Sequence, residues 1–351
     1  MNKKYIISKN LFHNLNFIKS KTSSKICAVV KGDAYGHGMK VIANLLKEKV
    51  DFFAVANLSE AISFRGFDTS SNLLILGHCD NYEIAIKKNI SVTITSFEEL
   101  KNCEDVAINL DKICHIHLKI DSGMNRIGIW KKRELKKCLK LLKTSNYLFF
   151  EGIYTHFCSL RSDEDYFKKQ KMFFDKMLSL IPKKFSPITH VGGSKVLDRN
   201  LAYNMIRVGI FLYGYNHSNL KKVMFINSEV INVKQIKKGE QVGYNSAFIA
   251  DKSMDIATLS IGYFDGLNYD FKGRVINNCL SYDDNMNHLK NTHFLSVCMD
   301  MIMIENYGEH FKIGDEVTIF NDAEIWQEAV GVNTHAILIE FSKMRGKTIV
   351  L

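Results

Sequence analysis

The sequence predicts an α/β protein, with an N-terminal (β/α)8 TIM-like barrel followed by a mostly β C-terminal domain. Over the first two-thirds of the 351 residues, eight short apolar runs alternate with segments of helical periodicity. Each run is almost continuously hydrophobic, which is typical of strands that are buried on both faces. Beyond about residue 225 the runs become shorter and are broken by Gly, Asn and Asp. This change of texture predicts a second domain.

The predicted barrel strands are residues 26–31, 52–58, 72–78, 91–96, 114–121, 149–156, 186–191 and 205–213. Helical spacing follows the first seven of them at residues 38–49, 59–66, 82–89, 97–102, 131–143, 163–181 and 195–203. Eight strands that alternate with helices fit a closed barrel better than an open doubly wound sheet. We therefore assign residues 1–224 to the barrel domain.

Residues 225–351 form the predicted C-terminal β domain. Its strand-like runs are residues 230–233, 241–244, 256–261, 294–303 and 316–320, and only residues 323–342 have helical character. The chain contains 2 prolines, and no Pro-rich linker separates the domains.

Composition argues against several classes of protein. The net charge of +10 comes from lysines that are mixed with apolar residues at helical spacing, which is typical of solvated helix faces. Without a zinc finger, an RNP motif or a basic arm, nucleic-acid binding is the least supported function. No apolar run approaches the roughly 18 residues of a membrane span. The eight cysteines include no C-x-x-C pair, so we expect a cytoplasmic protein with free thiols and no metal.

Polar side chains follow the predicted strands at the end where barrel enzymes place their active sites. Along the chain they are Lys31 before Gly-Asp-Ala-Tyr-Gly-His-Gly, Lys119 and Asp121 before Arg126, His156, His190 before Gly-Gly-Ser194, and Arg207 before Gly209-Ile210. Carboxyl ends of parallel strands share one rim, so these residues predict a single site.

Lys31 is the strongest candidate in this set. An amine that follows the apolar residues 27–30 would be desolvated, which lowers its pKa and allows Schiff-base chemistry. Taken alone, a lysine at a strand end more often extends to solvent. The glycines at positions 32, 36 and 38, which would let the backbone approach a ligand, and the Tyr35 hydroxyl shift the balance toward a binding site.

The other candidates are weaker one by one. Ser194 and the amides of Gly209 and Ile210 could hold a phosphate, although Gly-Gly is more often a plain turn. Taken singly, His156 and His190 are more often structural histidines than catalytic ones. Lys119 is unusual, because a barrel interior rarely tolerates an unpaired ammonium group.

Five motifs in order give the chain a resemblance to alanine racemases, from residue 6 to about residue 345. The segment Val29-Val30-Lys31-Gly32-Asp33-Ala34-Tyr35-Gly36-His37-Gly38 resembles the family's cofactor-lysine signature. The other four motifs lie at residues 118–128, 207–210, 261–266 and 297–300.

This resemblance implies a two-base racemase that uses pyridoxal 5'-phosphate and supplies D-alanine for the cell wall. Lys31 would carry the cofactor and act as the base on D-alanine, and Tyr263 would be the base on L-alanine. Arg207 would face the pyridine nitrogen. In the family the tyrosine reaches the active site of the other subunit, so the resemblance implies a homodimer with shared sites.

The remaining roles are implied in the same way. His156 would lie between Tyr263 and Arg207. The phosphate would be held by Tyr35, Ser194, Gly209 and Ile210, and the substrate carboxylate by Arg126 and Met299. Lys119 matches a position that is carbamylated in many relatives, a change that would replace its positive charge with a negative one.

The sequence also departs from the family pattern in ways that bear on specificity. Phe264 replaces a frequent Ala, Leu267 a frequent aromatic residue, Gly193 a frequent Asn and Val208 a typical Pro, and the C-terminal Arg-x-Pro-Arg pattern is reduced to Lys343-Met344-Arg345-Gly346. A racemase of serine or another amino acid is therefore the main alternative. A non-catalytic carrier of pyridoxal phosphate is less favoured, because such carriers generally lack the β domain.

Overall fold

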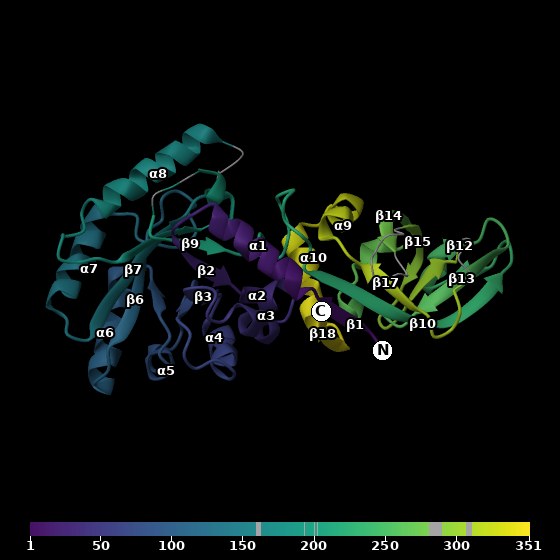
Figure 1. Ribbon diagram of the computed structural model, residues 1–351, viewed down its shortest axis with the longest axis horizontal. Coiled ribbons are helices and arrows are strands. Elements are labelled where there is room, and N and C mark those ends of the chain that lie inside the picture. The colour runs from purple at the N-terminus through teal and green to yellow at the C-terminus, as the bar shows by residue number, and fades with distance from the viewer. Residues whose placement is uncertain (159–162, 193, 200, 202, 281–289, 307–310) are drawn as a thin grey trace. The chain divides into compact units, whose positions relative to one another are not determined.

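Figure 1 shows the computed structural model, which describes residues 1–351 apart from 159–162, 193, 200, 202, 281–289 and 307–310. Contacts divide the chain into two compact units. One contains residues 16–31 and 39–212, and it is called the barrel unit below. The other contains residues 1–15, 32–38 and 213–351, and it is called the C-terminal unit.

The barrel unit is built on eight parallel strands in the order β4-β3-β2-β9-β8-β7-β6-β5. Backbone hydrogen bonds between Ser91 and both Leu73 (2.8 Å) and Ile75 (3.0 Å) join the two outer strands of this order, which closes the barrel. The predicted barrel is confirmed. Its strands are β2 (Lys25–Val29), β3 (Phe52–Val55), β4 (Leu73–Ile75), β5 (Val92–Ile94), β6 (Cys114–Lys119), β7 (Leu148–His156), β8 (Ile188–Gly192) and β9 (Met205–Val208).

Helices connect the successive strands (Figure 1). Asn57, Asn81, Ser96 and Asp163 each cap a helix, since their side-chain oxygens accept the backbone N–H three residues on, which lacks a partner inside the helix. The helices are α3 (Met39–Leu46), α4 (Leu58–Arg65), α5 (Tyr82–Lys87), α6 (Phe97–Leu110), α7 (Lys132–Thr144) and α8 (Glu164–Leu178), and α1 (Ser8–Ser20) precedes the barrel. Among the described residues, no helix is long and apolar enough to cross a membrane.

The seventh connection differs from the prediction. Instead of a helix over residues 195–203, the short 3-10 helix η1 (Ser194–Arg199) leads toward β9. The last strand is also shorter than expected, since Gly209 and the residues after it leave the ladder and form a turn with the Leu212 N–H donating to the Gly209 carbonyl at 2.9 Å. Hydrophobic runs in a sequence therefore overestimate strands whose ends turn into buried loops.

The C-terminal unit contains a mixed sheet of eight strands in the order β14-β15-β16-β13-β10-β1-β18, with β17 paired to β10. Its strands are β1 (Lys3–Ile6), β10 (Met224–Ile236), β13 (Met254–Leu259), β14 (Arg274–Leu280), β15 (Lys290–Val297), β16 (Ile302–Glu305), β17 (Glu316–Phe320) and β18 (Lys347–Val350), beside the small pair β11 (Gln241–Val242) and β12 (Phe248–Ile249). The predicted mostly β character is confirmed.

The N-terminal strand was not predicted. β1 pairs with β10 and with β18, so it joins the sheet of the C-terminal unit. Its four residues include two lysines and are too short for a period to be recognised.

An aromatic cluster forms the core of this unit around Trp326 in α9 (Ala323–Val330). Trp326 is fully buried, and the centre of its ring system lies 4.3 Å from the ring centre of Phe271, 4.9 Å from that of Phe320 and 5.7 Å from that of Phe341. These rings come from α9, β17 and two 3-10 turns, η4 (Tyr269–Phe271) and η5 (Phe341–Lys343), with α10 (Thr334–Glu340) before the latter. Two further 3-10 turns are η2 (Tyr244–Ser246) and η3 (Tyr263–Asp265).

Truncating one ring of this cluster should destabilise the unit. We expect Phe271→Ala to lower its free energy of unfolding by about 3–5 kcal/mol, because apolar contacts are lost and a cavity remains. Trp130 is exposed, so Trp130→Phe leaves the buried Trp326 as the single fluorescent reporter. Urea unfolding of Phe271→Ala in that background, compared with Trp130→Phe alone, gives the difference. Equal midpoints would contradict the assignment of this core.

Candidate active site

Basic side chains gather at the carboxyl ends of the barrel strands. Lys31 follows β2, Lys119 ends β6, Arg126 lies in the next loop, His156 ends β7 and Arg207 lies in β9. Burial, Arg126 and Arg207 lower the pKa of Lys31, against the opposing charge of Glu60. Burial lowers the pKa of Lys119 to about 8, with help from Arg126 and Arg207. The structure thus brings the sequence-predicted residues of the barrel close enough for their charges to affect one another's pKa.

His156 belongs to the same group. Burial lowers its pKa to about 3, and Arg207, Arg126, Lys119 and Lys31 act in the same direction, so the imidazole is neutral at physiological pH. A Cβ atom built on Gly192 would lie 2.5 Å from His156 Nδ1 and 2.2 Å from Arg207 Nη2. Only glycine at this position leaves room for both side chains.

Arg207 is held on several sides. It is 4% exposed, and its guanidinium lies 4.4 Å from the centre of the Tyr154 ring. Nη2 donates to the Thr155 carbonyl at 2.8 Å, and Nη1 donates to His190 Nδ1 at 2.7 Å. Burial lowers the pKa of Arg207 to about 10, which still leaves it charged near neutral pH.

The nearby carboxylates serve the backbone rather than these cations. Asp121 accepts the N–H groups of Gly123, Asn125 and Arg126 at 2.9–3.0 Å. Glu60 accepts the N–H of Ala56 at 2.7 Å. Within the described part of the chain, no ion pair joins a carboxylate to Lys31, Lys119, Arg126 or Arg207. Of these four side chains, Lys119 and Arg207 are buried. Buried positive charge without a matching carboxylate is suited to an anionic ligand.

A left-handed helical turn directly follows Lys31. In α2 (Lys31–Tyr35), the φ angles of Gly32, Asp33, Ala34 and Tyr35 are 62°, 52°, 54° and 53°. Each non-glycine residue in this region costs about 1–2 kcal/mol. The turn therefore needs strong contacts to hold it.

Those contacts come from the C-terminal unit, to which residues 32–38 belong. The buried Lys4 ammonium donates to the carbonyls of Gly36 (2.7 Å) and Phe341 (2.8 Å). His37 Nδ1 donates to the Tyr35 carbonyl at 2.8 Å. A Cβ at Gly36 would lie 1.9 Å from the Leu338 carbonyl oxygen. The expectation that Gly36 opens the backbone to a ligand is therefore wrong, because it is the α10 backbone that approaches it.

The sequence-predicted phosphate residues are placed as follows. Tyr35 is buried, and its ring packs against Tyr213 at 5.1 Å and His335 at 5.6 Å. Gly209 and Ile210 follow β9 directly, just beyond Arg207. Ser194 begins η1, but its side chain lies outside the described part of the structure, and so does Gly193.

Tyr263 and Met299 are brought together in the C-terminal unit. The Tyr263 N–H donates to the Cys298 carbonyl at 3.0 Å, and the Phe264 N–H donates to the Met299 carbonyl at 3.1 Å. A Cβ at Gly262 would lie 2.2 Å from that Met299 oxygen, so the two turns approach closely. Tyr263 is 38% exposed and Met299 is 50% exposed, so both can meet a ligand or another chain.

Sequence reasoning missed the residue that anchors these two turns. Arg345 donates to both oxygens of the fully buried Asp265 at 2.8–2.9 Å, and it reaches Asp300 at 2.7 Å. Asp265 lies in the Tyr263 turn, and Asp300 follows Met299. In the sequence, Arg345 belongs to the reduced C-terminal pattern, for which no role is predicted. The signal for it was a lone arginine near the end of the chain and two aspartates beside predicted site residues.

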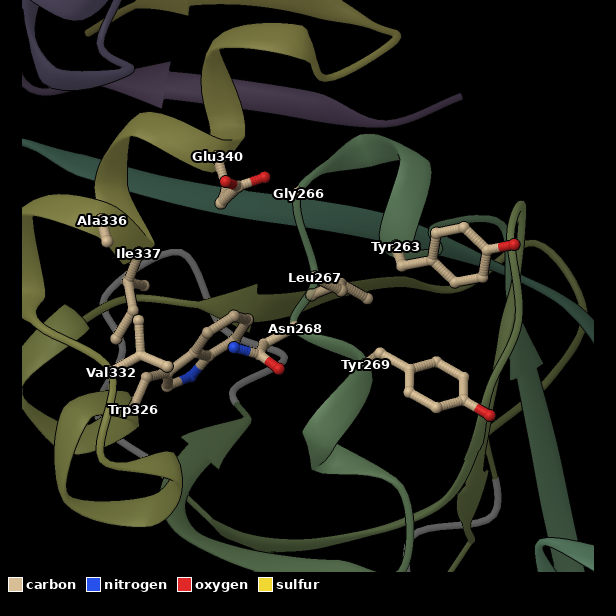
Figure 2. Close-up of a pocket in the computed structure, with 10 residues that line it drawn as sticks. All are labelled: Tyr263, Gly266, Leu267, Asn268, Tyr269, Trp326, Val332, Ala336, Ile337 and Glu340. Atoms are coloured by element: carbon tan, nitrogen blue, oxygen red, sulfur yellow. The ribbon is translucent and has the colours of Figure 1, made fainter.

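A cavity of about 490 Å³ opens beside Tyr263 in the C-terminal unit (Figure 2). Tyr263 and Tyr269 stand together on one side, with ring centres 6.1 Å apart, while Trp326 and Ile337 lie across from them. Leu267, one of the residues that depart from the family pattern, lines this cavity. No group of His, Cys, Asp and Glu that could hold a metal ion occurs among the described residues.

Comparison with known proteins agrees with this arrangement. The family model for the alanine racemase N-terminal domain matches residues 6–217 of this chain, and the family model for the alanine racemase C-terminal domain matches residues 223–349. Alanine racemase 2 of Caldanaerobacter subterraneus is 33% identical over 341 residues, covering 90% of this chain and 84% of the relative.

Solved structures give the same result. An alanine racemase from Clostridium difficile has a TM-score of 0.90 at 30% identity, covering 99% of this chain and 96% of that one. A histidine racemase from Leuconostoc mesenteroides shares the fold, with a TM-score of 0.89 at 23% identity, covering 99% and 97% of the two chains. The fold alone therefore does not select the substrate. The chain belongs to the alanine racemase family, and its relatives support the activity of an amino-acid racemase.

Proposed function

We propose that this protein is an alanine racemase that interconverts L-alanine and D-alanine with pyridoxal 5'-phosphate and supplies D-alanine for peptidoglycan synthesis. The observation that carries the proposal is that Lys31, whose pKa is lowered, and the buried guanidinium of Arg207 lie at the same end of the barrel. A neutral amine can attack an aldehyde, and the guanidinium supplies fixed positive charge.

The residues present fit this cofactor. Its aldehyde needs a neutral amine, which the desolvation of Lys31 favours. Its overall negative charge favours a site whose buried positive charge is not neutralised by a carboxylate, as at Arg207. Tyr35, Ser194, Gly209 and Ile210 would hold the phosphate, with a hydroxyl or backbone N–H at each position. The cofactor supplies an electron sink that acidifies the Cα–H bond of the amino acid.

The chain's own residues would then move the proton. Lys31 takes or returns it on the face of D-alanine, and Tyr263 does so on the face of L-alanine, which inverts the centre without turning the substrate. Arg207 would face the pyridine nitrogen as a hydrogen-bond donor and would keep its protons, because guanidinium stays charged. His156 lies next to Arg207, and its neutral ring can accept a hydrogen bond from Tyr263.

Arg126 and the Met299 amide would bind the substrate carboxylate. Near neutral pH the Lys119 amine, whose pKa is about 8, is partly neutral and could add to carbon dioxide with release of one proton. The resulting carbamate would place a negative charge beside Arg126 and remove the unpaired ammonium from the barrel. Tyr263 of the partner subunit would complete each site, so we propose a homodimer; the exposure of Tyr263 and Met299 supports this.

A racemase of serine or another amino acid remains the second candidate. Phe264 is 48% exposed beside Tyr263, and Leu267 lines the adjacent cavity, where both depart from the family pattern. Pocket discrimination of one small group amounts to only about 1–3 kcal/mol, so a few such changes can alter specificity. A pyridoxal phosphate carrier is disfavoured, because the chain has the C-terminal β unit and Tyr263.

Lys31→Ala should abolish both cofactor attachment and racemisation. We expect kcat to fall by at least about 10³-fold, since the covalent attachment point and one base are lost together. The measurements are the absorbance of the bound cofactor and the rate of D-alanine formation. Lys40→Ala, an exposed lysine in the next helix, is the matched control and should retain full activity. Racemisation by Lys31→Ala would sink the assignment.

Tyr263→Phe should spare cofactor binding and block proton removal from L-alanine. We expect Cα exchange in D2O to fall by about 10²–10⁴-fold from L-alanine, the range for loss of one general base. Exchange from D-alanine, which uses Lys31, should persist. Tyr269→Phe tests the neighbouring tyrosine and should change neither rate. Normal exchange from L-alanine in Tyr263→Phe would rule out the two-base scheme.

Mixing the two inactive variants tests whether Tyr263 acts across subunits. When Lys31→Ala and Tyr263→Phe chains are unfolded and refolded together, a mixed dimer contains one intact site, and about a quarter of wild-type activity should return. If both residues act within one chain, the mixture stays inactive.

The substrate is tested by incubating the protein and cofactor with L-alanine, L-serine or L-lysine in D2O. Fast Cα deuteration with loss of optical rotation for alanine alone is the expected result. Faster racemisation of serine or lysine would replace alanine as the substrate and keep the mechanism. Cofactor binding without exchange for any of them would mean that the proposed function is wrong.

A further inference from the structure

A chain of buried hydrogen bonds leads from Arg207 into the interior of the barrel. Arg207 Nη1 lies 2.7 Å from His190 Nδ1. His190 Nε2 lies 2.8 Å from His117 Nδ1, and His117 Nε2 lies 2.9 Å from Glu151 Oε2. Both histidines are fully buried. These hydrogen bonds connect β9 to β8, β8 to β6 and β6 to β7, so they link residues that are far apart in the sequence.

The chemistry of its two ends sets the direction of every bond. Arg207 can only donate, so His190 Nδ1 must accept and the proton of a neutral His190 must be on Nε2. His190 therefore donates to His117 Nδ1. His117 in turn carries its proton on Nε2 and donates to the Glu151 carboxylate. One tautomer of each ring satisfies all three bonds.

The surroundings keep His190 and His117 neutral, while Arg207 and Glu151 at the two ends are charged. Burial lowers the pKa of His190, helped by the charge of Arg207. Burial also lowers the pKa of His117, although the bond to Glu151 opposes it. Burial alone would raise the pKa of Glu151, but the hydrogen bonds from His115 and His117 outweigh it and hold the pKa below its usual range. The contact between His117 and Glu151 is thus a hydrogen bond from a neutral ring.

The packing leaves space for this line of side chains. A Cβ on Gly152 would lie 2.3 Å from His117 Nδ1, so a glycine is required where β7 passes the ring. The His190 ring stacks on Tyr154 at 4.6 Å, and the Arg207 guanidinium lies over the same Tyr154 ring. Tyr154 is fixed by hydrogen bonds of its hydroxyl to Thr93 (2.8 Å) and the Leu76 carbonyl (3.1 Å).

The far end of the chain is anchored as well. Glu151 also accepts from Ser91 at 2.5 Å and from His115 Nδ1 at 3.1 Å. Three donors on one carboxylate fix its orientation, which in turn fixes His117 and His190.

We propose that His190, His117 and Glu151 are positioning residues that hold Arg207 in one orientation and thereby favour racemisation over transamination. This inference rests on the proposed function. A fixed guanidinium would lie at the pyridine nitrogen without giving up a proton, which would limit the negative charge that the cofactor ring accepts. If His117 cannot accept, the buried Nε2–H of His190 loses its partner, and only the bond from Arg207 still favours that tautomer. The tautomer with the proton on Nδ1 then becomes accessible. A donor would then face the Arg207 donor, and Arg207 would turn away and leave the nitrogen open to protonation.

Two substitutions of His117 separate the hydrogen bond from the bulk of the side chain. His117→Leu removes the acceptor that faces His190. His117→Asn retains an oxygen close to the position of Nδ1 and can still accept. Leu118→Ala, at the neighbouring fully buried position of β6, is the control for general destabilisation of the strand.

The main measurement is the ratio of two products. Transamination converts alanine and pyridoxal phosphate into pyruvate and pyridoxamine phosphate, so pyruvate counts these events. We expect His117→Leu to raise the amount of pyruvate formed per racemisation by about 10- to 100-fold. Effects of this size are typical when a residue that orients a ligand-contacting side chain is replaced. His117→Asn should recover most of this change. Leu118→Ala should lower the midpoint of thermal unfolding and leave the ratio unchanged.

A second measurement does not depend on activity. In 15N-histidine-labelled protein without cofactor, His190 should have an unprotonated Nδ1 and a protonated Nε2, and it should not titrate between about pH 5 and 8. In His117→Leu this signature should change, and in His117→Asn it should return. Spectra of a His190→Asn variant assign the signals.

Each outcome decides one question. The opposite tautomer of His190 in the wild-type protein, or an unchanged product ratio in His117→Leu, would overturn the positioning role. An equal rise of the ratio in Leu118→Ala would do the same, since it would mean that any loosening of the strand has this effect. A wild-type protein with the expected tautomers but no racemisation would overturn the proposed function and leave the hydrogen-bonded chain established.

Discussion

The constraint on which the site depends is the burial of positive charge at one end of a closed barrel. Lys119 and Arg207 are about 95% buried, and no ion pair with a carboxylate compensates them in the described part of the protein. Such burial is unfavourable unless hydrogen bonds or an anionic ligand offset it. For Arg207 the barrel supplies a carbonyl, an aromatic face and a neutral imidazole. Burial and the neighbouring positive charges also lower the pKa values of Lys31, Lys119 and His156.

A second constraint lies just beyond Lys31, where several successive residues take left-handed backbone conformations. The cost is offset by burying Ala34 and Tyr35, by hydrogen bonds from Lys4 and His37, and by the close approach of Gly36 to α10. Of these contacts, those of Lys4 and α10 come from residues near the two ends of the chain. The same principle governs the Tyr263 turn, which Arg345 anchors through Asp265. Both turns that carry the proposed chemistry are therefore held by distant parts of the sequence.

Much of this fold could be predicted, because the barrel strands are buried on both faces and appear as continuous apolar runs. Capped helices such as α8 were located from their periodicity in the same way. β1 could not be predicted, since four residues with two lysines carry no period and their pairing partners are more than 200 residues away. η1 was misjudged because a predicted helical spacing of a few residues does not exclude a tighter turn.

The sequence by itself determined the alternation of strands and helices, the mostly β C-terminal unit and the identity of the reactive candidates, because these depend on local period and on residue type. Only the tertiary structure decided the state of those residues. The lowered pKa of Lys31, the tautomers of His117 and His190, and the anchoring of Asp265 by Arg345 each depend on burial and on partners from distant segments. Desolvation and hydrogen-bond direction are properties of a packed environment, which no stretch of sequence contains.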